Sequence, residues 1–335
     1  MTELHRRVLM TGAFSLSVAA MTTKAQDKKI STMKHFAKGD VFIGATLLNN
    51  PADDHAGAGR ILQYDADLKE KGVLWVEGTT HLVGGLSFAP DGTLWAFDNL
   101  AWKVVRVGSD GKQIDARQLL DRAIGKVQFL KNGNYVLSEY FKGTAQPQGL
   151  TTRYKYLPDH PTEVGMGGLY EFSPDGKLVH THYPEVTGGV SGSMAITHAD
   201  LASDGKTLIY TSETGLRVMR YDLAARKQLS DLKTLAPSQG GPPAMVFDVA
   251  VSGARVLLPL GNRLEVLSED GAEIAKVPLP GFGWAVAAAS MDAEAAYAGN
   301  WFTGDVVKVS LKDGAVTAKV NVGPKCISGL VQYKG

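Results

Sequence analysis

Short stretches of alternating apolar and polar residues, separated by glycine-rich turns, run through most of the chain. In the clearest one, Gly85–Phe88 and Leu94–Asp98 flank the turn Pro90-Asp91-Gly92. Alternation on both sides of a turn that favours positive backbone angles predicts a β-hairpin. Residues 104–107 supply a third strand, residues 109–112 form a turn, and a fourth strand follows this turn. The stretch therefore predicts a four-stranded unit.

This four-stranded unit recurs along the chain. Further copies begin near residues 126, 199, 247 and 284, each with apolar strands and Gly-containing turns. Repeats of roughly 40 residues that each form a small antiparallel sheet are typical of β-propellers, and about six copies fit this chain. The pattern therefore predicts an all-β fold and favours a propeller over the alternative, a β-sandwich.

One copy is divided between the two ends of the chain. Residues 40–45, 60–64 and 72–76 supply its second, third and fourth strands, whereas 327–333 form a first strand with no second strand after it. Joining the ends completes a blade and removes exposed sheet edges. We therefore expect a six-bladed β-propeller over 40–335, closed by pairing of the C-terminal strand with the N-terminal blade.

The residues before the propeller carry a pattern typical of export signals. His5-Arg6-Arg7 precedes the apolar stretch 8–21, which is too short to span a bilayer, and small residues follow up to Ala25. Arg6-Arg7 also matches the twin-arginine export pattern. We expect 1–25 to be a signal peptide, 26–39 a linker, and the mature protein to be periplasmic or secreted.

Composition narrows the classes of partner. The 335 residues include 35 Lys and Arg against 34 Asp and Glu, which gives no reason to expect nucleic acid or an anionic membrane. The mature chain holds no apolar segment that predicts a membrane span. Its single cysteine, Cys326, excludes an intrachain disulfide and a multi-cysteine zinc site. The expected partner is a small-molecule substrate.

Propeller topology assigns the long insertions to one face. Loops between second and third strands share a face with the connections between blades, opposite the short turns. The long segments 47–59, 141–166 and 184–197 all fall in such positions. Because long loops on a rigid scaffold usually carry function, we expect the working site on this face.

Polar residues at the ends of second strands and the starts of first strands should surround the axis there. Carboxylates and imidazoles that converge could form an acid/base pair or hold a divalent cation such as Ca²⁺, Mg²⁺ or Zn²⁺. The expected catalytic residues are His81, Glu139, His198 and Glu213, and the expected metal ligands are Asp98, Asn300 and Glu213. The expected substrate-binding residues are Arg153, Tyr154, Phe247, Trp284 and Trp301. Asp53-Asp54-His55, in a loop of the same face, could also reach inward.

The repeat motif resembles that of a known superfamily. Gly-Leu-x-Phe-x-Pro-Asp-Gly-x-Leu-Trp-x-x-Asp at 85–98, followed by Val-x-Arg-x and Asp-Gly, is similar to the senescence-marker-protein/gluconolactonase superfamily and its six-bladed relatives, the NHL-repeat propellers and streptogramin lyases. The resemblance covers the chain from about Asp40 and specifies fold better than activity.

For the lactonase branch, the resemblance implies an axial divalent cation, with Asp98 and Asn300 at two ligand positions. Where that branch has an Asn before a Gly-Leu strand, this chain has Gly84, Thr197 or Ser328. The lyase branch implies a His and a Glu around magnesium, to which His198 with Glu139 or Glu213 would correspond. The expected function is thus an exported lactonase- or esterase-like hydrolase, with a lyase and a non-catalytic ligand- or protein-binding propeller as alternatives.

Overall fold

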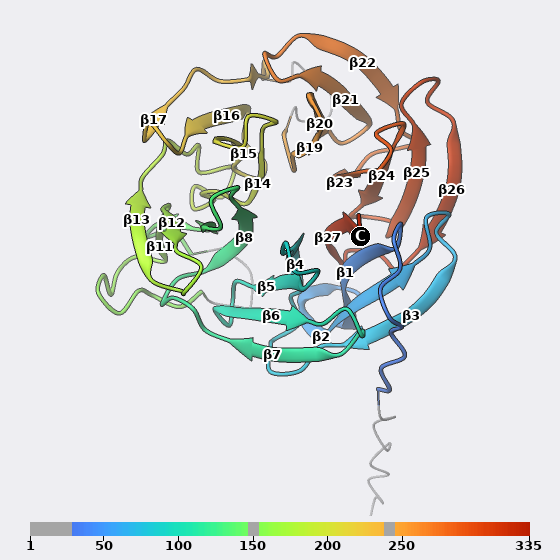
Figure 1. Ribbon diagram of the computed structural model, residues 1–335, viewed down its shortest axis with the longest axis horizontal. Coiled ribbons are helices and arrows are strands. Elements are labelled where there is room, and N and C mark those ends of the chain that lie inside the picture. The colour runs from blue at the N-terminus through green and yellow to red at the C-terminus, as the bar shows by residue number, and fades with distance from the viewer. Residues whose placement is uncertain (1–28, 147–153, 238–244) are drawn as a thin grey trace, which may run out of the picture.

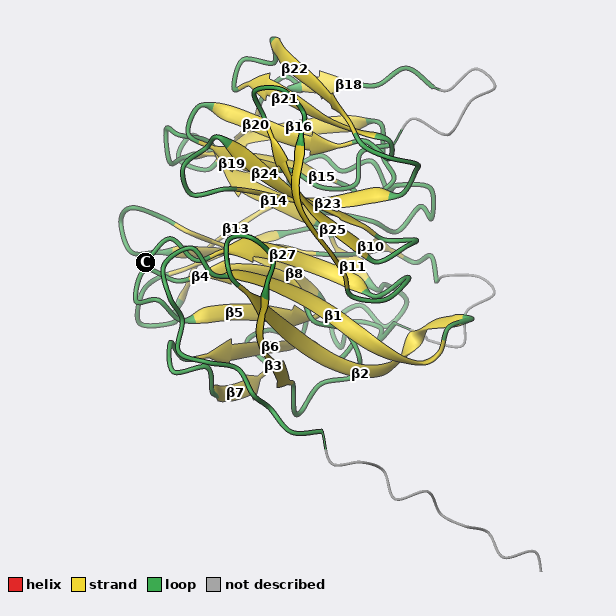
Figure 2. Cartoon of the chain, turned by 90° about the vertical axis from the view of Figure 1, so that its right-hand side faces the viewer, coloured by secondary structure: helices red, strands yellow, loops and turns green. Residues whose placement is uncertain are grey.

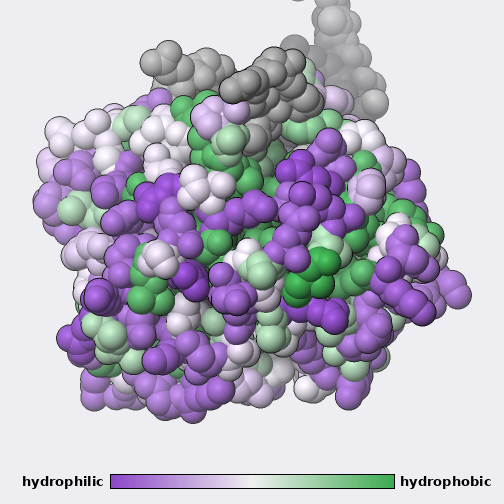
Figure 3. All heavy atoms as spheres, turned by 90° about the horizontal axis from the view of Figure 1, so that it is seen from above, coloured by the Kyte–Doolittle hydropathy of each residue, from purple (hydrophilic) through white to green (hydrophobic). Residues whose placement is uncertain are grey.

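The computed structural model describes residues 29–146, 154–237 and 245–335, and in these ranges six antiparallel sheets surround a central axis (Figure 1). The six-bladed β-propeller predicted from the repeats is confirmed. The described ranges hold no helix that is long and apolar enough to cross a membrane. Seen from one side, the outer wall is mostly hydrophilic with small apolar patches (Figure 3). The expected signal peptide, 1–25, lies outside the described residues.

Five blades are each built from one continuous stretch of chain, and their strands run in order from the axis outward. The first contains β4 (Gly84–Phe88), β5 (Leu94–Asp98), β6 (Lys103–Val107) and β7 (Gln113–Arg117). The second contains β8 (Ile124–Phe129), β9 (Tyr135–Glu139), β12 (Leu169–Phe172) and β13 (Leu178–His182). The third contains β14 (His198–Leu201), β15 (Thr207–Thr211), β16 (Arg217–Asp222), β17 (Lys227–Gln228) and β18 (Lys233–Thr234). The fourth contains β19 (Ala250–Ser252), β20 (Arg255–Pro259), β21 (Arg263–Ser268) and β22 (Glu273–Pro278). The fifth contains β23 (Trp284–Ala289), β24 (Ala295–Asn300), β25 (Asp305–Ser310) and β26 (Val316–Asn321).

The sixth blade closes the ring, as the sequence predicted. Its strand order is β27 (Ile327–Gln332), β1 (Val41–Asn50), β2 (Asp53–Tyr64) and β3 (Glu70–Trp75). The C-terminal β27 pairs with the N-terminal β1, so that Leu330 lies opposite Ile43. Neither strand therefore presents an unpaired edge to water at the join.

The stretch before β1, expected to be a linker, is fixed to the propeller where it is described. The N–H groups of Thr32 and Met33 both donate to the carbonyl of Val73 in β3. The ring of Phe36 packs edge-on against Phe42, with centroids 4.6 Å apart. Residues 32–36 thus cover the outer part of the closing blade rather than forming a free connection.

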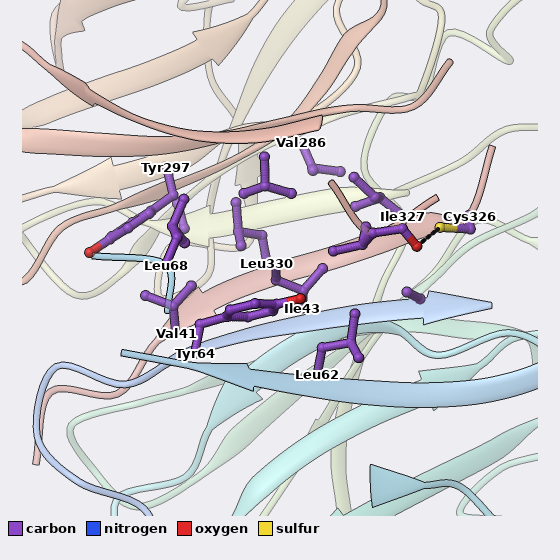
Figure 4. Close-up of a cluster of buried hydrophobic side chains, with 14 residues drawn as sticks. Val41, Ile43, Leu62, Tyr64, Leu68, Val286, Tyr297, Cys326, Ile327 and Leu330 are labelled. Atoms are coloured by element: carbon purple, nitrogen blue, oxygen red, sulfur yellow. Dashed lines mark hydrogen bonds between the residues drawn. The ribbon is translucent and has the colours of Figure 1, made fainter. Parts of the chain in front are cut away.

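Apolar side chains fill the space between neighbouring blades. Between the closing blade and the fifth blade, Val41, Ile43 and Leu330 pack with Val286 and Tyr297 (Figure 4). All of them are buried. Because each apolar strand face is covered by the next blade, the propeller forms a rigid wall around the axis.

Residues 47–59, expected to be a loop, instead continue the hairpin of β1 and β2. The two strands pair out to Asn50 and Asp53, whereas β1 leaves β27 after Ala45 and β2 leaves β3 at Arg60. Residues 46–59 therefore form a two-stranded projection, here called the ribbon, which extends past the other strands in Figure 2. Gly57 permits the pairing, since a Cβ there would lie 2.3 Å from the carbonyl oxygen of Leu47.

The other two insertions meet on the same face. The segment after β9 forms the short hairpin β10 (Lys142–Gly143) and β11 (Gly165–Met166). It is joined to the connection before β14 by a bridge between Phe141 and Met194 and by a 2.8 Å hydrogen bond from Lys142 N–H to the Ser193 carbonyl. The inserted segments thus support one another over the face predicted from the topology.

Candidate functional site

A cavity of about 450 Å³ opens at the axis, on the face where the first strands of the blades begin. Each of the six blades contributes lining residues, from the start of its first strand or the end of its second. This volume suits a small organic molecule. The cavity lies on the face that carries the ribbon and the insertions.

The cavity walls are mainly apolar, and the polar groups among them are few. The apolar lining consists of Leu82, Phe97, Met245, Phe247, Phe282, Ala285, Val286, Trp301, Phe302 and Ile327. The polar lining consists of Asn99, Tyr140, Thr197, His198, Glu213, Thr214 and Ser328. Apolar walls with a few oriented polar groups are typical of small-molecule sites.

His198 and Glu213 are joined through the hydroxyl of Thr197. Thr197 Oγ1 accepts the backbone N–H of Glu213 at 2.9 Å and lies 3.2 Å from His198 Nδ1. The hydroxyl proton is directed to the Thr211 carbonyl at 3.3 Å. With the hydroxyl proton on the Thr211 carbonyl, the tautomer of His198 that fits this contact donates from Nδ1, and in that tautomer the lone pair of Nε2 is available as a base.

The carboxylate of Glu213 is held from the neighbouring blade. Tyr140 donates a 2.7 Å hydrogen bond from its hydroxyl to Glu213 Oε2. Burial of the phenol, with the charge of Glu213 beside it, raises the pKa of Tyr140 well above its ordinary value. The phenol therefore stays protonated and remains a donor to the carboxylate at neutral pH.

Tyr154 lies beside this network. Its ring packs against Phe141, with centroids 3.9 Å apart, and so belongs to the insertion. Burial raises its pKa to about 12, with smaller contributions from the charges of Glu213 and Asp54. Its phenol is near both carboxylates, although it does not line the cavity itself.

Two successive residues at the end of the second strand have opposite roles in four of the blades. The second of each pair lines the cavity: Asn99, Tyr140, Glu213 and Trp301. The first of each pair is buried and does not line it: Asp98, Glu139, Ser212 and Asn300. Because successive side chains of extended backbone point to opposite sides, a shift of one residue decides whether a group can reach a ligand.

The predicted metal ligands Asp98 and Asn300 belong to the buried set. Asp98 Oδ1 accepts the N–H groups of Leu100 and Ala101, and its Oδ2 accepts the N–H and hydroxyl of Thr80. Asn300 Oδ1 accepts two backbone N–H groups, at Phe302 and Thr303. Both side chains hold turns of their own blades in place.

The predicted catalytic residue Glu139 also holds a loop. Its carboxylate accepts the N–H groups of Met166 and Gly168 and the hydroxyl of Tyr170, at 2.9–3.0 Å. Burial raises its pKa, against the opposing effect of these hydrogen bonds and of Arg122, whose Nε lies 3.7 Å away. Glu139 thus fixes the return of the insertion to β12 and does not face the cavity.

The remaining predicted residues are divided. Phe247 and Trp301 line the cavity, as do His198 and Glu213. Trp284 lies inside the fifth blade, where its indole N–H donates to the Pro280 carbonyl at 3.0 Å. His81 is buried just outside the cavity wall, and burial lowers its pKa although the Asp98 carboxylate opposes the shift. Arg153 lies outside the described residues.

The expected axial metal ion does not fit the side chains at the axis. Protein donors already occupy both carboxylate oxygens of Asp98 and the amide oxygen of Asn300. Glu213, the third predicted ligand, is the only carboxylate among the lining residues. The positions at which the related branch has an Asn are Gly84, Thr197 and Ser328, and Thr197 is itself fully hydrogen-bonded.

Among the lining residues, Tyr140 and Phe282 were not identified by the sequence reasoning, and Thr197 was identified only by its position at the start of a first strand. Tyr140 follows the second strand by one residue, as Glu213 does, and a correct strand register would have identified it. Thr197 precedes the first strand of its blade, and only its contacts reveal its role. Phe282 carries no pattern that distinguishes it from a core aromatic.

Comparison with known proteins supports the fold. No known family and no curated protein matches the sequence. A chain of a nidogen/laminin complex matches with a TM-score of 0.59 and 10% identity, over 88% of this chain and 99% of that one. A protein of unknown function from Bacteroides caccae matches with a TM-score of 0.58 and 12% identity, over 89% and 100%. A Lactobacillus plantarum protein matches with a TM-score of 0.54 and 12% identity, over 88% and 99%.

At these identities the similarity shows the propeller fold alone. A virginiamycin B lyase from Staphylococcus aureus also matches, with a TM-score of 0.46 and 11% identity over 72% of this chain and 71% of that one. That match is too distant to carry an argument about activity.

Proposed function

We propose that this protein is a hydrolase for a small lactone or ester, which binds in the axial cavity and reacts beside His198 and Glu213. The observation that carries the proposal is the hydroxyl of Thr197, which contacts His198 Nδ1 and the N–H of Glu213 together. This arrangement orients one imidazole as a base and places one carboxylate on the same wall. The repeat motif at 85–98, with its resemblance to the gluconolactonase superfamily, supports the same class of substrate.

In the proposed reaction His198 moves one proton in each direction. Nε2 accepts a proton from a water molecule as the water oxygen attacks the carbonyl carbon of the substrate. The tetrahedral intermediate then expels its alkoxide, which takes the proton back from the imidazolium. A lactone gives a hydroxy acid, and an ester gives an acid and an alcohol.

Glu213 and the cavity walls support this proton transfer. Its carboxylate, held by Tyr140, favours the positive imidazolium that forms during the reaction. The aromatic walls bind the apolar part of the substrate and exclude bulk water, which strengthens these charge interactions. Positioning by the rigid blades keeps water, substrate and base close together.

Elimination is the second reaction that the oriented Nε2 supports. A base of this kind could remove a proton next to a carbonyl group instead of activating water. The apolar lining also suits a protein that binds a ligand without converting it. These alternatives differ in product: hydrolysis adds water, elimination creates a double bond, and binding leaves the ligand unchanged.

The experiment incubates the protein with a panel of lactones, esters and elimination substrates and identifies the products by mass spectrometry. Parallel reactions contain about 1 mM EDTA, which removes any divalent metal ion. We expect water addition to at least one lactone or ester, and we expect it to persist with EDTA. His198→Ala should lower kcat/KM by about 100-fold or more, as for loss of a general base. The exposed His35 provides the matched control, and His35→Ala should retain the wild-type value.

Two outcomes would contradict the proposal. If a folded His198→Ala protein kept its turnover, His198 would not be the general base. Binding of panel members in the cavity without any product would instead favour the non-catalytic alternative. Folding of each variant is checked by its thermal transition.

A further inference from the structure

Three consecutive residues at the tip of the ribbon place metal-binding atoms together. Asp53, Asp54 and His55 each offer one ligand atom, and these atoms lie within 4.8 Å of one another. In a regular strand the middle side chain would point away, but a turn gathers them here, with Asp53 Oδ1 accepting the N–H of His55 at 3.0 Å. All three residues are half-buried.

The ligand atoms of this cluster lie close together but do not complete one another's hydrogen bonds. His55 Nδ1 lies 2.6 Å from Asp54 Oδ1, and yet it is buried without a hydrogen-bond partner of acceptable geometry. Within the described ranges, no Lys or Arg forms an ion pair with Asp53 or Asp54. His55 Nδ1 is therefore a buried nitrogen whose hydrogen-bonding capacity no described group uses, and such a group calls for a partner.

His81 provides an independent observation. Its ring is almost fully buried, with 5% of the residue exposed, and its nitrogens make no hydrogen bond to any described residue. The ring faces His55, with centroids 6.2 Å apart and planes inclined by 63°. Two imidazoles that bind one ion at about 2.1 Å have centroids roughly 5–6 Å apart. The ligand atoms already within 4.8 Å of one another are those of Asp53, Asp54 and His55, so the His81 ring would have to move toward them to reach the same ion.

The backbone near His81 is fixed against the ribbon. The hydroxyl of Thr46 donates to the His81 carbonyl at 2.8 Å. Gly59 lets the chains approach, because a Cβ there would lie 3.1 Å from that same carbonyl oxygen. On the other side, Asp98 holds Thr80 through its N–H and hydroxyl. The ribbon and the segment before β4 are therefore held together before any ligand binds.

We propose that this junction binds one divalent transition-metal ion, of which Zn²⁺ is the representative, through Asp53, Asp54, His55 and His81. Two carboxylates neutralise the charge of the ion, and two imidazoles favour zinc-like ions over calcium or magnesium, which prefer oxygen ligands. A bound ion would also neutralise the negative charge of the two carboxylates, which form no ion pair with a Lys or Arg among the described side chains.

The site lies at the rim of the cavity and is separate from the axis. Leu82, the residue after His81, lines the cavity wall, but none of the four ligands does. The charges of both Asp54 and Glu213 act on the phenol of Tyr154, so this side chain is near both places. An ion would thus fix the ribbon to the cavity rim without touching His198, and the inference does not depend on the proposed hydrolysis.

Direct metal binding tests this inference. The untagged mature protein, freed of metal with a chelator, is titrated with Zn²⁺ by calorimetry and with Co²⁺ by visible absorption. We expect about one equivalent to bind, and we expect Co²⁺ to show the intense bands of low-coordinate nitrogen and oxygen ligation. Asp54→Asn and His55→Gln change half-buried ribbon residues and should weaken binding by more than the roughly 10- to 100-fold that follows loss of an outer-shell partner.

His81→Gln should weaken binding similarly, and if this buried substitution prevents folding, the two ribbon variants decide the question. The matched control is His35→Gln, because His35 is exposed and remote from the cluster. Glu213→Gln should bind metal as the wild type does, which separates this inference from the proposed function. Absence of stoichiometric binding, or binding unchanged in Asp54→Asn and His55→Gln, would overturn it.

Discussion

Tyr140 and Glu213 leave the second strands of two neighbouring blades and meet in a 2.7 Å hydrogen bond at the cavity wall. The pair joins two rigid sheets at the point where the polar groups converge. Its geometry depends on the register of both strands, since a shift of one residue in either would turn one side chain away from the cavity.

Tyr140→Phe should test this contact with little change of shape. We expect kcat/KM to fall by about 10- to 100-fold, as for loss of a hydrogen bond to a charged group, because the Glu213 carboxylate would lose its orientation. The free energy of unfolding, measured in urea, should fall by only about 1 kcal/mol since the ring still fills its site. Wild-type kcat/KM in a stable Tyr140→Phe protein would contradict this role.

Trp301→Ala should affect binding more than chemistry. Trp301 lines the apolar wall, and its backbone hydrogen bonds are with Gly283 and Lys325 rather than with the Thr197 network. We expect KM to rise by about tenfold while kcat stays within about twofold, because the wall binds substrate and transition state alike. Trp75 on β3 is the control, since it lies outside the cavity lining and Trp75→Ala should leave KM unchanged. A large fall in kcat alone would contradict the assignment.

Removal of β27 should prevent ring closure. Deletion of 327–335 would expose the edge of β1 and uncover buried residues such as Val41 and Ile43. We expect loss of soluble monomer by size-exclusion chromatography, because an apolar unpaired edge promotes association. Deletion of the exposed residues 334–335 alone should leave a folded monomer. A stable monomer without β27 would show that closure is dispensable.

Glu265 should make stability depend on pH. Burial disfavours its charged form, but Lys233 and Arg263 outweigh this effect and lower the pKa of the carboxyl. Their contribution to stability should be complete above the unfolded-state pKa of about 4.3 and should be lost as the pH falls through the lower folded-state pKa. At pH 7, Glu265→Gln should lower the free energy of unfolding by roughly 1–3 kcal/mol, because Lys233 and Arg263 partly reach water.

The difference between wild type and Glu265→Gln should shrink in urea titrations at progressively lower pH. A difference that stays constant down to pH 3 would contradict the linkage. Glu294→Gln, at an exposed position, serves as the control and should show no such dependence.

The fold was predictable because each blade carries its own signal. Alternation around turns such as Pro90-Asp91-Gly92 identified strands, and the unmatched segments at the two ends identified the closing blade. These signals are local, so they survive in a single sequence. The ribbon was missed because its Gly- and Ala-rich strand lacks a clear apolar alternation.

The site was only partly predictable because its register is not local. Glu139 and Glu213 seemed equivalent in the sequence as acidic residues at strand ends. In the structure Glu139 still pairs with Ile124 in its sheet, whereas the last pair of the next blade is Thr211 with His198, so Glu213 lies beyond the ladder. Cross-strand pairing alone decides which carboxylate faces the cavity.

The most direct test of this account compares Glu213→Gln with Glu139→Gln, using kcat/KM per folded molecule together with the thermal transition. We expect Glu213→Gln to lose about 100-fold or more in kcat/KM at an unchanged Tm. Glu139→Gln should lower the free energy of unfolding by roughly 1–3 kcal/mol, since it disturbs three hydrogen bonds of a buried carboxylate, and should keep its turnover. The opposite result, with activity lost in Glu139→Gln and retained in Glu213→Gln, would contradict the placement of the site.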